Sequence, residues 1–409
     1  MSFLRAAHAA RAGQSNGLRI LVAVFVVLAG FSLSCGKSNQ STSPSNRDAY
    51  VTLPAWGSVL LLHIDGATGQ MNTGAQTPQQ QDFTPAGLAF LPSKNILYAI
   101  NSFDDTISIF NVAGDGTLTL GASPTPAGAS PNAVVIDPSG KYLLVTNNFS
   151  SGGDYNGGEI SVFRIDPSTG ALSPLGSPVP ANTNPTEILF THSGQFVYVT
   201  NPEIGMVTGF VFCPPERASE PQCSAANGVL SLVPGTPVSS GQGGGALGLA
   251  VDGSNRFLYV TNPSATNPPP NQSTIGNISG FNIDPTSGAL TPILGSPFTS
   301  TVGGQGPTTI TIDPTGRLVY AVTPGSIFSV WCFEITYPNG QLVAVTNSPF
   351  SVAAGGQFAL FDPSGRFFYI GSAIGIEAYT YNPSTGVLTP ILGSPFSTLT
   401  APGKMVFSE

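Results

Sequence analysis

Carboxylates in loops are the side chains of this chain whose type and position suit catalysis. Asp105, Asp154 and Glu203 each lie in a polar segment that follows an apolar, strand-like run. A carboxylate in such a loop can serve as a general base that takes a proton from water. We therefore interpret these three residues as candidate catalytic groups for a hydrolysis. The same segments hold the candidate ligand-binding residues, namely Trp56, Asn101, Asp104, Asn147, Glu159, Asn201 and Asn262.

Each candidate also has a structural interpretation, which stays open beside the functional one. Adjacent acidic residues such as Asp104 and Asp105 are typical of a solvated turn, and the insertion that holds Asp154 is rich in glycine. The four asparagines can cap turns, because an Asn side chain bonds nearby backbone groups. Trp56 suits stacking on a sugar, but it suits packing at a loop rim as well.

A repeated phrase of two strands and a turn organises the chain around these loops. Its best copies are VFRIDPSTGALSPLGSPV from Val162, GFNIDPTSGALTPILGSPF from Gly280 and YTYNPSTGVLTPILGSPF from Tyr379. A second phrase, such as AVVIDPSGKYLLVTNN from Ala133, alternates with it. Apolar and polar residues alternate within these runs, which indicates strands rather than helices.

Together the two phrases give four strands per unit, which we name a to d in chain order. Strand a starts near residues 85, 131, 185, 246, 307, 357 and 402, so the units are about 45 to 60 residues long. Units of this length with four strands are typical of β-propeller blades. The predicted fold is therefore all-β: a seven-bladed β-propeller with four antiparallel strands per blade, over residues 48–409.

The two ends of the chain predict how the ring closes. The segment AYVTLPAW from Ala49 has the pattern of strand b, whereas PGKMVFSE at the C-terminus has the pattern of a lone strand a. Neither end completes a blade by itself. We expect the C-terminal strand to join three N-terminal strands in the seventh blade, because this closure removes the unpaired sheet edges of an open array.

In such a blade the b–c loops and the d–a linkers lie on one face, and the a–b and c–d turns lie on the other. All the candidate residues fall on the first face. Its loops hold no Arg, Lys or His, and Lys404 at the start of the last strand is the nearest cation. This distribution disfavours a phosphosugar substrate, because a phosphate needs cationic or backbone N–H partners. A divalent cation such as Ca²⁺ or Mg²⁺ could supply positive charge, but no loop has a recognised calcium motif, so the metal ligands and the need for a cofactor stay unknown.

The motifs resemble those of the lactonase-type seven-bladed propellers, a family that includes bacterial 6-phosphogluconolactonase and a carboxymuconate cycloisomerase. The resemblance rests on the YVTN segments at Tyr198 and Tyr259, on the DPSGK-type turns and on the DPxTGxLxPxxGSP phrase. It covers residues 48–409 and implies the propeller fold and hydrolysis of a lactone. Every shared motif is a turn or a strand, so none of them identifies a catalytic residue.

The N-terminal segment predicts export. Arg5, Arg11 and Arg19 flank the start of an apolar run over residues 20–31, which is typical of a signal peptide over residues 1–34. Cys35 follows directly, as in the lipobox of a bacterial lipoprotein, although Ser32 stands where the lipobox prefers Leu. An ordinary cleaved signal with an incidental cysteine is the alternative. We expect residues 35–47 to form a flexible tether, and the protein to lie in the bacterial cell envelope, periplasmic or surface-exposed, with a lipid anchor as its only membrane contact.

The cysteines agree with an exported protein. Cys213 and Cys223 flank the short insert CPPERASEPQC, and we expect them to form a disulfide, which persists outside the cytoplasm. Two free thiols in a loop are the alternative. Cys332 lies in an apolar strand, where we expect it to be a small core residue.

Composition and charge disfavour one class of binding partner. The net charge of −8, with only 8% charged residues, argues against nucleic acid. Two function classes remain for what we expect to be a monomer. The first is a lactonase-like hydrolase of a neutral or cationic lactone, which carboxylates converging at the centre of the first face would favour. The second is a non-catalytic propeller that binds a glycan or a protein, which an exposed apolar patch beside residues 262–277 would favour.

Overall fold

The computed structural model describes residues 45–78, 83–121, 123–150, 157–223, 228–240, 245–263, 276–299, 306–324 and 329–408. The predicted signal peptide, Cys35, most of the tether, Asp154 and most of the insertion at 262–277 lie outside this part of the chain. From Asn46 onward the described residues are strands and turns, with short 3₁₀ turns at Pro54–Trp56 (η1), Pro92–Lys94 (η2) and Pro215–Arg217 (η3). A helix long and apolar enough to span a membrane does not occur within these ranges.

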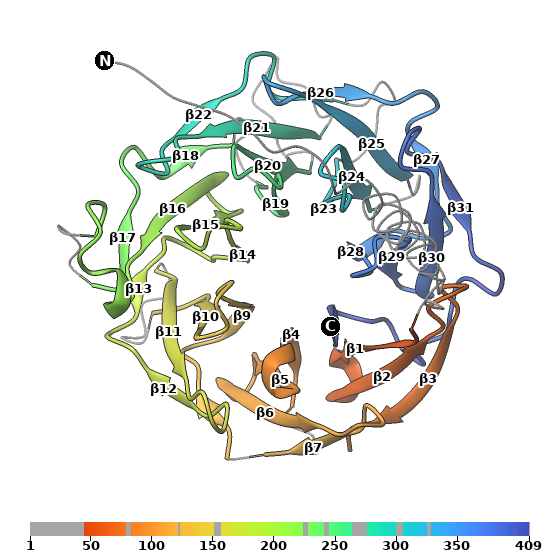
Figure 1. Ribbon diagram of the computed structural model, residues 1–409, viewed down its shortest axis with the longest axis horizontal. Coiled ribbons are helices and arrows are strands. Elements are labelled where there is room, and N and C mark those ends of the chain that lie inside the picture. The colour runs from red at the N-terminus through yellow and green to blue at the C-terminus, as the bar shows by residue number, and fades with distance from the viewer. Residues whose placement is uncertain are drawn as a thin grey trace, which may run out of the picture. The chain divides into compact units, whose positions relative to one another are not determined.

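Seven antiparallel sheets are arranged around a common centre, and one edge strand of each sheet is the innermost (Figure 1). We number the blades by this innermost strand. Blade 1 is β4 (Pro85–Leu91), β5 (Ile96–Asn101), β6 (Thr106–Val112) and β7 (Leu118–Leu120); blade 2 is β9 (Pro131–Ile136), β10 (Tyr142–Asn147), β11 (Glu159–Ile165) and β12 (Leu172–Pro174); blade 3 is β14 (Glu187–Phe190), β15 (Phe196–Asn201), β16 (Met206–Phe212) and β17 (Leu230–Leu232).

The remaining blades repeat this order. Blade 4 is β19 (Leu249–Val251), β20 (Phe257–Asn262), β21 (Asn277–Ile283) and β22 (Leu290–Pro292); blade 5 is β23 (Thr309–Ile312), β24 (Leu318–Thr323), β25 (Ser329–Thr336) and β26 (Gln341–Ala344); blade 6 is β28 (Gly356–Phe361), β29 (Phe367–Ser372), β30 (Gly375–Tyr381) and β31 (Leu388–Pro390); blade 7 is β32 (Met405–Phe407), β1 (Arg47–Leu53), β2 (Ser58–Ile64) and β3 (Met71–Gln76). Four short strands also pair with the third strands of blades 1, 2, 3 and 5, respectively. They are β8 (Thr125–Pro126), β13 (Val179–Pro180), β18 (Val238–Ser239) and β27 (Phe350–Ser351).

Blade 7 confirms the predicted closure of the ring. The C-terminal strand β32 pairs with β1 in antiparallel register, with Ala49 opposite Phe407 and Val51 opposite Met405. The backbone N–H of Thr52 also donates to the carbonyl of Lys404 at 2.9 Å. The seven-bladed, all-β fold expected from the repeats is therefore correct, and the last strand of the chain is held in a sheet formed by the first three.

The core lies between neighbouring blades. Every residue of β15 is buried, and its Tyr198 shares a buried cluster with Leu258 and Phe281 of blade 4. The β-branched and aromatic residues of the repeats suit this arrangement, because both faces of each middle strand are covered. Each large apolar side chain buried in this way contributes about 1.5–3 kcal/mol to folding.

A tyrosine hydroxyl joins six of the seven blades to the next one. The tyrosine is the fourth residue from the end of strand b, and its hydroxyl donates to a glycine carbonyl in the c–d turn of the following blade. We call this contact the tyrosine latch. The latches are Tyr50 to Gly116 (2.8 Å), Tyr98 to Gly170 (2.7 Å), Tyr198 to Gly288 (2.7 Å), Tyr259 to Gly340 (2.7 Å), Tyr320 to Gly386 (3.0 Å) and Tyr369 to Gly69 (3.1 Å).

The glycine of each latch is required by the turn. Gly288 has φ of +75°, a conformation that costs a residue with a side chain about 1–2 kcal/mol. A Cβ atom at Gly288 would also lie 2.5 Å from the ring of Phe196 in the preceding blade. The DPxTG turn is therefore a docking element between blades, which explains why it recurs along the chain.

Arginines on the same side of the ring add a second contact at three junctions. Arg256 donates to the carbonyl of Pro338 (2.7 Å), Arg317 to that of Pro383 (2.9 Å) and Arg366 to that of Gly66 (2.7 Å). Each acceptor lies in the c–d turn of the next blade. These cations are therefore engaged in holding blades together.

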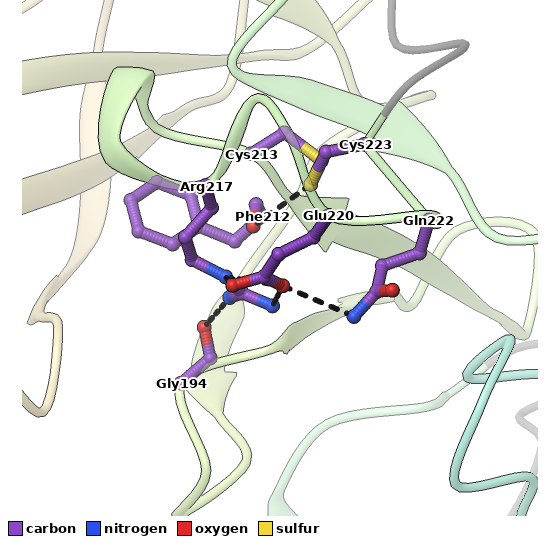
Figure 2. Close-up of a disulfide and its surroundings, with 7 residues drawn as sticks. All are labelled: Gly194, Phe212, Cys213, Arg217, Glu220, Gln222 and Cys223. Carbon is purple, nitrogen blue, oxygen red and sulfur yellow. Dashed lines mark hydrogen bonds and ion pairs between the residues drawn. A yellow bond between two sulfur atoms is a disulfide. The ribbon is translucent and has the colours of Figure 1, made fainter.

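The junction between blades 2 and 3 is built differently. Leu144 stands at the latch position of blade 2, and the c–d turn of blade 3 is replaced by the insert that Cys213 and Cys223 close with a disulfide (Figure 2). Glu216 of this insert accepts hydrogen bonds from Tyr142 and, at 3.1 Å, from Arg164 of blade 2.

The insert is also held to its own blade. Arg217 forms an ion pair with Glu220 at 2.8 Å and donates to the carbonyl of Gly194 at 2.8 Å (Figure 2). The disulfide-closed insert therefore takes the place of the missing latch. Cys332 is a free, buried cysteine, as expected for a core position.

The latches predict that the protein loses stability in alkali. Burial raises the pKa of the six latch tyrosines, whereas tyrosine in an unfolded chain titrates near pH ~10. A raised pKa in the folded state means that this stability is complete below pH ~10 and is lost as the pH rises further. Thermal melts between pH 8 and 12 should therefore show a steep fall in Tm above pH ~10. Tyrosinate absorbance that appears while the near-ultraviolet circular dichroism is still native would contradict this account.

The disulfide predicts a redox-dependent stability. The two cysteines are 10 residues apart, and a loop of that size is worth about 2–3 kcal/mol to the free energy of unfolding. Replacement of both, C213S/C223S, should lower the denaturation midpoint accordingly. Reductant should lower the wild-type midpoint to that of the variant and leave the variant unchanged. An equal effect of reductant on both proteins would mean that the disulfide does not stabilise the junction.

Candidate functional site

The strand pairing sorts the loops onto two faces. Pro85 pairs with Asn101, which in turn pairs with Thr106, so the d–a linker and the b–c loop of blade 1 meet at one end of the sheet. We call this side the loop face, and the side with the a–b and c–d turns the turn face. The described candidate residues all lie on the loop face.

The repeated asparagines are buried and hold the loop face together. Asn101 donates to Thr106 (2.9 Å) and Ser108 (3.0 Å), and Asn147 donates to Ser161 (2.9 Å). Asn201 donates to the carbonyls of Ala181 (2.7 Å) and Thr183 (3.0 Å), and Asn262 donates to Ser240 (3.1 Å), Asn277 (2.8 Å) and Ser279 (2.9 Å). The four asparagines therefore have the structural role that was one of the two interpretations of the sequence. Their role in binding a ligand stays a prediction.

The acidic candidates stand apart from one another. Asp104, Asp105 and Glu203 are exposed in the b–c loops of blades 1 and 3. Asp105 accepts a hydrogen bond from the backbone N–H of Ser130 at 2.6 Å, and Glu203 accepts one from Asn184 at 3.2 Å.

The other two candidates on this face differ in exposure. Glu159, at the start of β11, is buried opposite Asn147. Trp56 is partly exposed on η1. The described catalytic candidates therefore have separate partners, and no contact joins them.

One ion pair does join distant blades on this face. Lys404 Nζ lies 3.0 Å from Glu187 Oε2. Lys404 precedes β32 in blade 7, and Glu187 begins β14 in blade 3. Blades 7 and 3 are not neighbours, so the contact crosses the centre of the ring. Both side chains keep solvent access, with exposed fractions of 40% for Lys404 and 35% for Glu187.

The two partners are positioned by the same local device. The backbone N–H of Lys404 donates to Thr52 Oγ1 at 2.8 Å, and that of Glu187 donates to Thr200 Oγ1 at 3.2 Å. Both threonines are fully buried in the middle strands of their blades. The YVT triplet thus fixes the entry of each inner strand, and it directs the charged side chains at these two entries toward the centre.

Sequence reasoning identified Lys404 as the nearest cation but missed Glu187. The predicted candidates lie in or beside the b–c loops, whereas Glu187 begins an inner strand. A signal was available, because Glu187 and Lys404 occupy the same place in the repeat with opposite charges. Their distance across the ring could not be read from the sequence.

The described part of the loop face carries more carboxylates than cations. Its exposed or half-exposed carboxylates in the described residues are Asp104, Asp105, Glu187 and Glu203, and Lys404 is its one cation there. Within the same ranges, no three His, Cys, Asp or Glu side chains are grouped so that they could hold a metal ion.

A further carboxylate on this face, Glu377, is buried. It accepts hydrogen bonds from the N–H groups of Ala353 and Ala354, both at 2.8 Å, and from the Tyr379 hydroxyl at 2.5 Å. Burial, with the Glu377 hydrogen bond, raises the pKa of Tyr379. This carboxylate is thus engaged in fixing the linker that enters blade 6.

Two cavities lie on the turn face. One of about 350 Å³ lies beneath the disulfide insert, beside Glu216 and Arg217. Another of about 540 Å³ lies between blades 3 and 4, beside Arg256. Arg217 and Arg256 are bound to Glu220 and to the Pro338 carbonyl, as described above. The turn-face cavities therefore have the character of packing gaps between blades.

Known proteins with similar sequences are lactonases. The chain matches the model of the family described as lactonase, 7-bladed beta-propeller, over residues 40–186, which confirms the resemblance seen in its motifs. It is 35% identical over 123 residues to the 6-phosphogluconolactonase of Formosa agariphila, a match that covers 29% of this chain and 33% of the relative. It is 30% identical over 151 residues to that of Pectobacterium atrosepticum, covering 34% and 42%. The matches thus span 33% to 42% of the length of these curated relatives.

Solved structures agree on the architecture. The periplasmic gluconolactonase PpgL of Pseudomonas aeruginosa superimposes with a TM-score of 0.68 at 18% identity, over 89% of this chain and 99% of the other. At this identity the similarity concerns the fold.

Proposed function

We propose that the protein hydrolyses an uncharged lactone at the centre of its loop face, with Glu187 and Lys404 as the reacting pair. The observation that carries this proposal is the ion pair itself, which places a base and a positively charged donor 3.0 Å apart where the inner strands meet. The match to lactonase sequences supports the reaction class. Both groups remain solvent-accessible, so a lactone and a water molecule can reach them.

The chemistry follows from the two side chains. A lactone carbonyl oxygen replaces a Glu187 oxygen as the acceptor for the Lys404 ammonium. Glu187 takes a proton from water while the water oxygen attacks the carbonyl carbon. The ammonium stabilises the negative charge that develops on the carbonyl oxygen. When the intermediate collapses, the ring C–O bond breaks, and the leaving alkoxide takes the proton from Glu187 to give the hydroxy acid.

The charges of the loop face favour a substrate without phosphate. Lys404 is needed at the carbonyl oxygen, and the surrounding carboxylates Asp104, Asp105 and Glu203 would repel a phosphate dianion. The curated relatives are named for a phosphorylated lactone, so this chain would differ from them in substrate. Glu203, Asp105 and Asp154 stay alternative candidates for the general base.

Activity measurements on two variants test the assignment. E187Q and K404M should each lower kcat/KM on δ-gluconolactone at least ~100-fold, measured against spontaneous hydrolysis. The matched control is E334Q, which breaks the ion pair of Glu334 with Arg317 on the turn face, at 2.9 Å and similar exposure. The control should keep its activity. Loss of an exposed pair changes the free energy of unfolding by less than ~1 kcal/mol, so all three variants should remain folded.

The alternatives give different results. An active E187Q with an inactive E203Q, D105N or D154N would move the base to that residue. Faster turnover of 6-phosphogluconolactone than of gluconolactone would contradict the uncharged substrate. No turnover of any lactone, with or without Ca²⁺ or Mg²⁺, would favour the non-catalytic binding propeller.

We also propose that the protein is exported and anchored by a lipid on Cys35. The signal-like N-terminus supports export, and one structural relative is a periplasmic enzyme. Cell fractionation of the expressed full chain should find the wild type with membranes and released by detergent, and C35S in the soluble periplasmic fraction. A C35S protein that still sediments with membranes would contradict the lipid anchor.

A further inference from the structure

Four exposed apolar side chains lie in loops of three consecutive blades on the loop face. They are Ile374 (52% exposed), Leu399 (59%), Trp56 (36%) and Phe103 (71%). They come from the b–c loop of blade 6, the linker into blade 7, the b–c loop of blade 7 and the b–c loop of blade 1. These blades are consecutive in the ring (Figure 1). We call these four residues the apolar arc. Large apolar residues in neighbouring loops offer a binding surface where a ligand brings them together into one apolar contact.

The arc is continuous with Lys404. Leu399 lies in the linker that ends at Lys404, and a Cβ atom at Gly403 would lie 3.0 Å from Pro54 of the 3₁₀ turn that carries Trp56. On the other side, a Cβ atom at Gly375, next to Ile374, would lie 2.3 Å from the Phe396 carbonyl at the start of the same linker. The linker is therefore in contact with the loops on both sides, and it leads from the apolar arc to the ammonium group.

Leu399 occupies an unusual conformation for its type. Its φ is +69°, and its N–H donates to Ser397 Oγ at 3.3 Å. A bulky residue rarely takes positive φ, which costs about 1–2 kcal/mol. The turn nevertheless directs this leucine into solvent rather than into the core. The same turn buries Thr398, whose hydroxyl donates to the Thr400 carbonyl at 2.7 Å. A bulky residue with positive φ and an exposed side chain is a reason to propose a function for that position.

From this geometry we infer that the substrate is a lactone with an alkyl or acyl tail, whose ring reacts at Glu187 and Lys404 while the tail lies on the apolar arc. The inference rests on the function proposed above. An uncharged ring suits a site whose one cation is needed at the carbonyl, and an apolar tail gains free energy from the arc by leaving water. Ile204 of blade 3 is also exposed on this face, but it belongs to another part of the ring.

Turnover of a homologous series tests the tail. We would compare γ-valerolactone, γ-octalactone and γ-dodecalactone, which share one ring and differ in tail length. The kcat/KM should rise at least ~10-fold along the series, since each buried methylene is worth a factor of a few. L399S and F103S should reduce the ratio of long-chain to short-chain kcat/KM. L294S is the matched control, because Leu294 is 84% exposed outside the arc, and its ratio should equal that of the wild type.

Fluorescence gives a readout that does not depend on turnover. The chain has two tryptophans, and Trp331 is buried in blade 5 while Trp56 belongs to the arc. Saturation with γ-dodecalactone should shift the emission to shorter wavelength, γ-valerolactone should not, and W56F should lose the shift.

The two experiments separate the two proposals. A tail-dependent emission shift without any lactone turnover would keep the tail site and overturn the proposed hydrolysis. Turnover that is independent of tail length, with no emission shift, would keep the hydrolysis and overturn the tail site. A loss of chain-length preference in L294S equal to that in L399S would also overturn the tail site.

Discussion

Pairing of the last strand with the first is the constraint on which the site depends. The register of Tyr50 opposite Val406 fixes the end of the chain within blade 7, and the bond from Lys404 N–H to Thr52 sets the direction of its side chain. Without this closure, Lys404 would belong to a free C-terminal segment. With it, the ammonium group reaches across the ring to Glu187, more than two hundred residues earlier in the chain. Closure thus serves stability by removing sheet edges, and it assembles the one cross-ring charge contact of the loop face within the described residues.

The contacts that hold neighbouring blades together and the candidate functional residues lie on different faces of the ring. On the turn face, tyrosine hydroxyls and arginine guanidinium groups donate hydrogen bonds to carbonyls in the c–d turn of the next blade. Where the tyrosine latch is missing, the insert closed by Cys213 and Cys223 makes the contact between the two blades. These contacts engage the arginines with acceptors of the protein itself. On the loop face, buried asparagines fix the backbone, and the exposed side chains of the loops lie beyond them. The loops therefore present their side chains from a rigid scaffold, which is where binding residues usually lie.

The sequence predicted the elements better than their contacts. Strand order, blade number and closure follow from counting the repeats, because each phrase has a fixed place in a blade. The tyrosine latch was also visible in principle, since Tyr recurs as the fourth residue from the end of six strands and Leu144 replaces it in one. Its partner glycine could not be identified, because that residue belongs to the next blade. Glu187 was missed for the same reason, because its partner Lys404 lies on the far side of the ring. No local pattern in the sequence shows the distance between the two residues.

The energetics of the Glu187–Lys404 pair argue for a functional interpretation over a structural one. Both side chains are more than a third exposed, so solvent screens their attraction, and a pair of this kind adds little to stability. The blades that it joins are already held by their own neighbours, so the ring does not need a link across its centre. The threonines beneath the pair are fully buried, and their hydroxyl oxygens accept hydrogen bonds from the backbone N–H groups of Glu187 and Lys404. A rigidly seated pair that stabilises little, and that stays open to solvent where the inner strands meet, has the properties expected of groups held ready for a substrate.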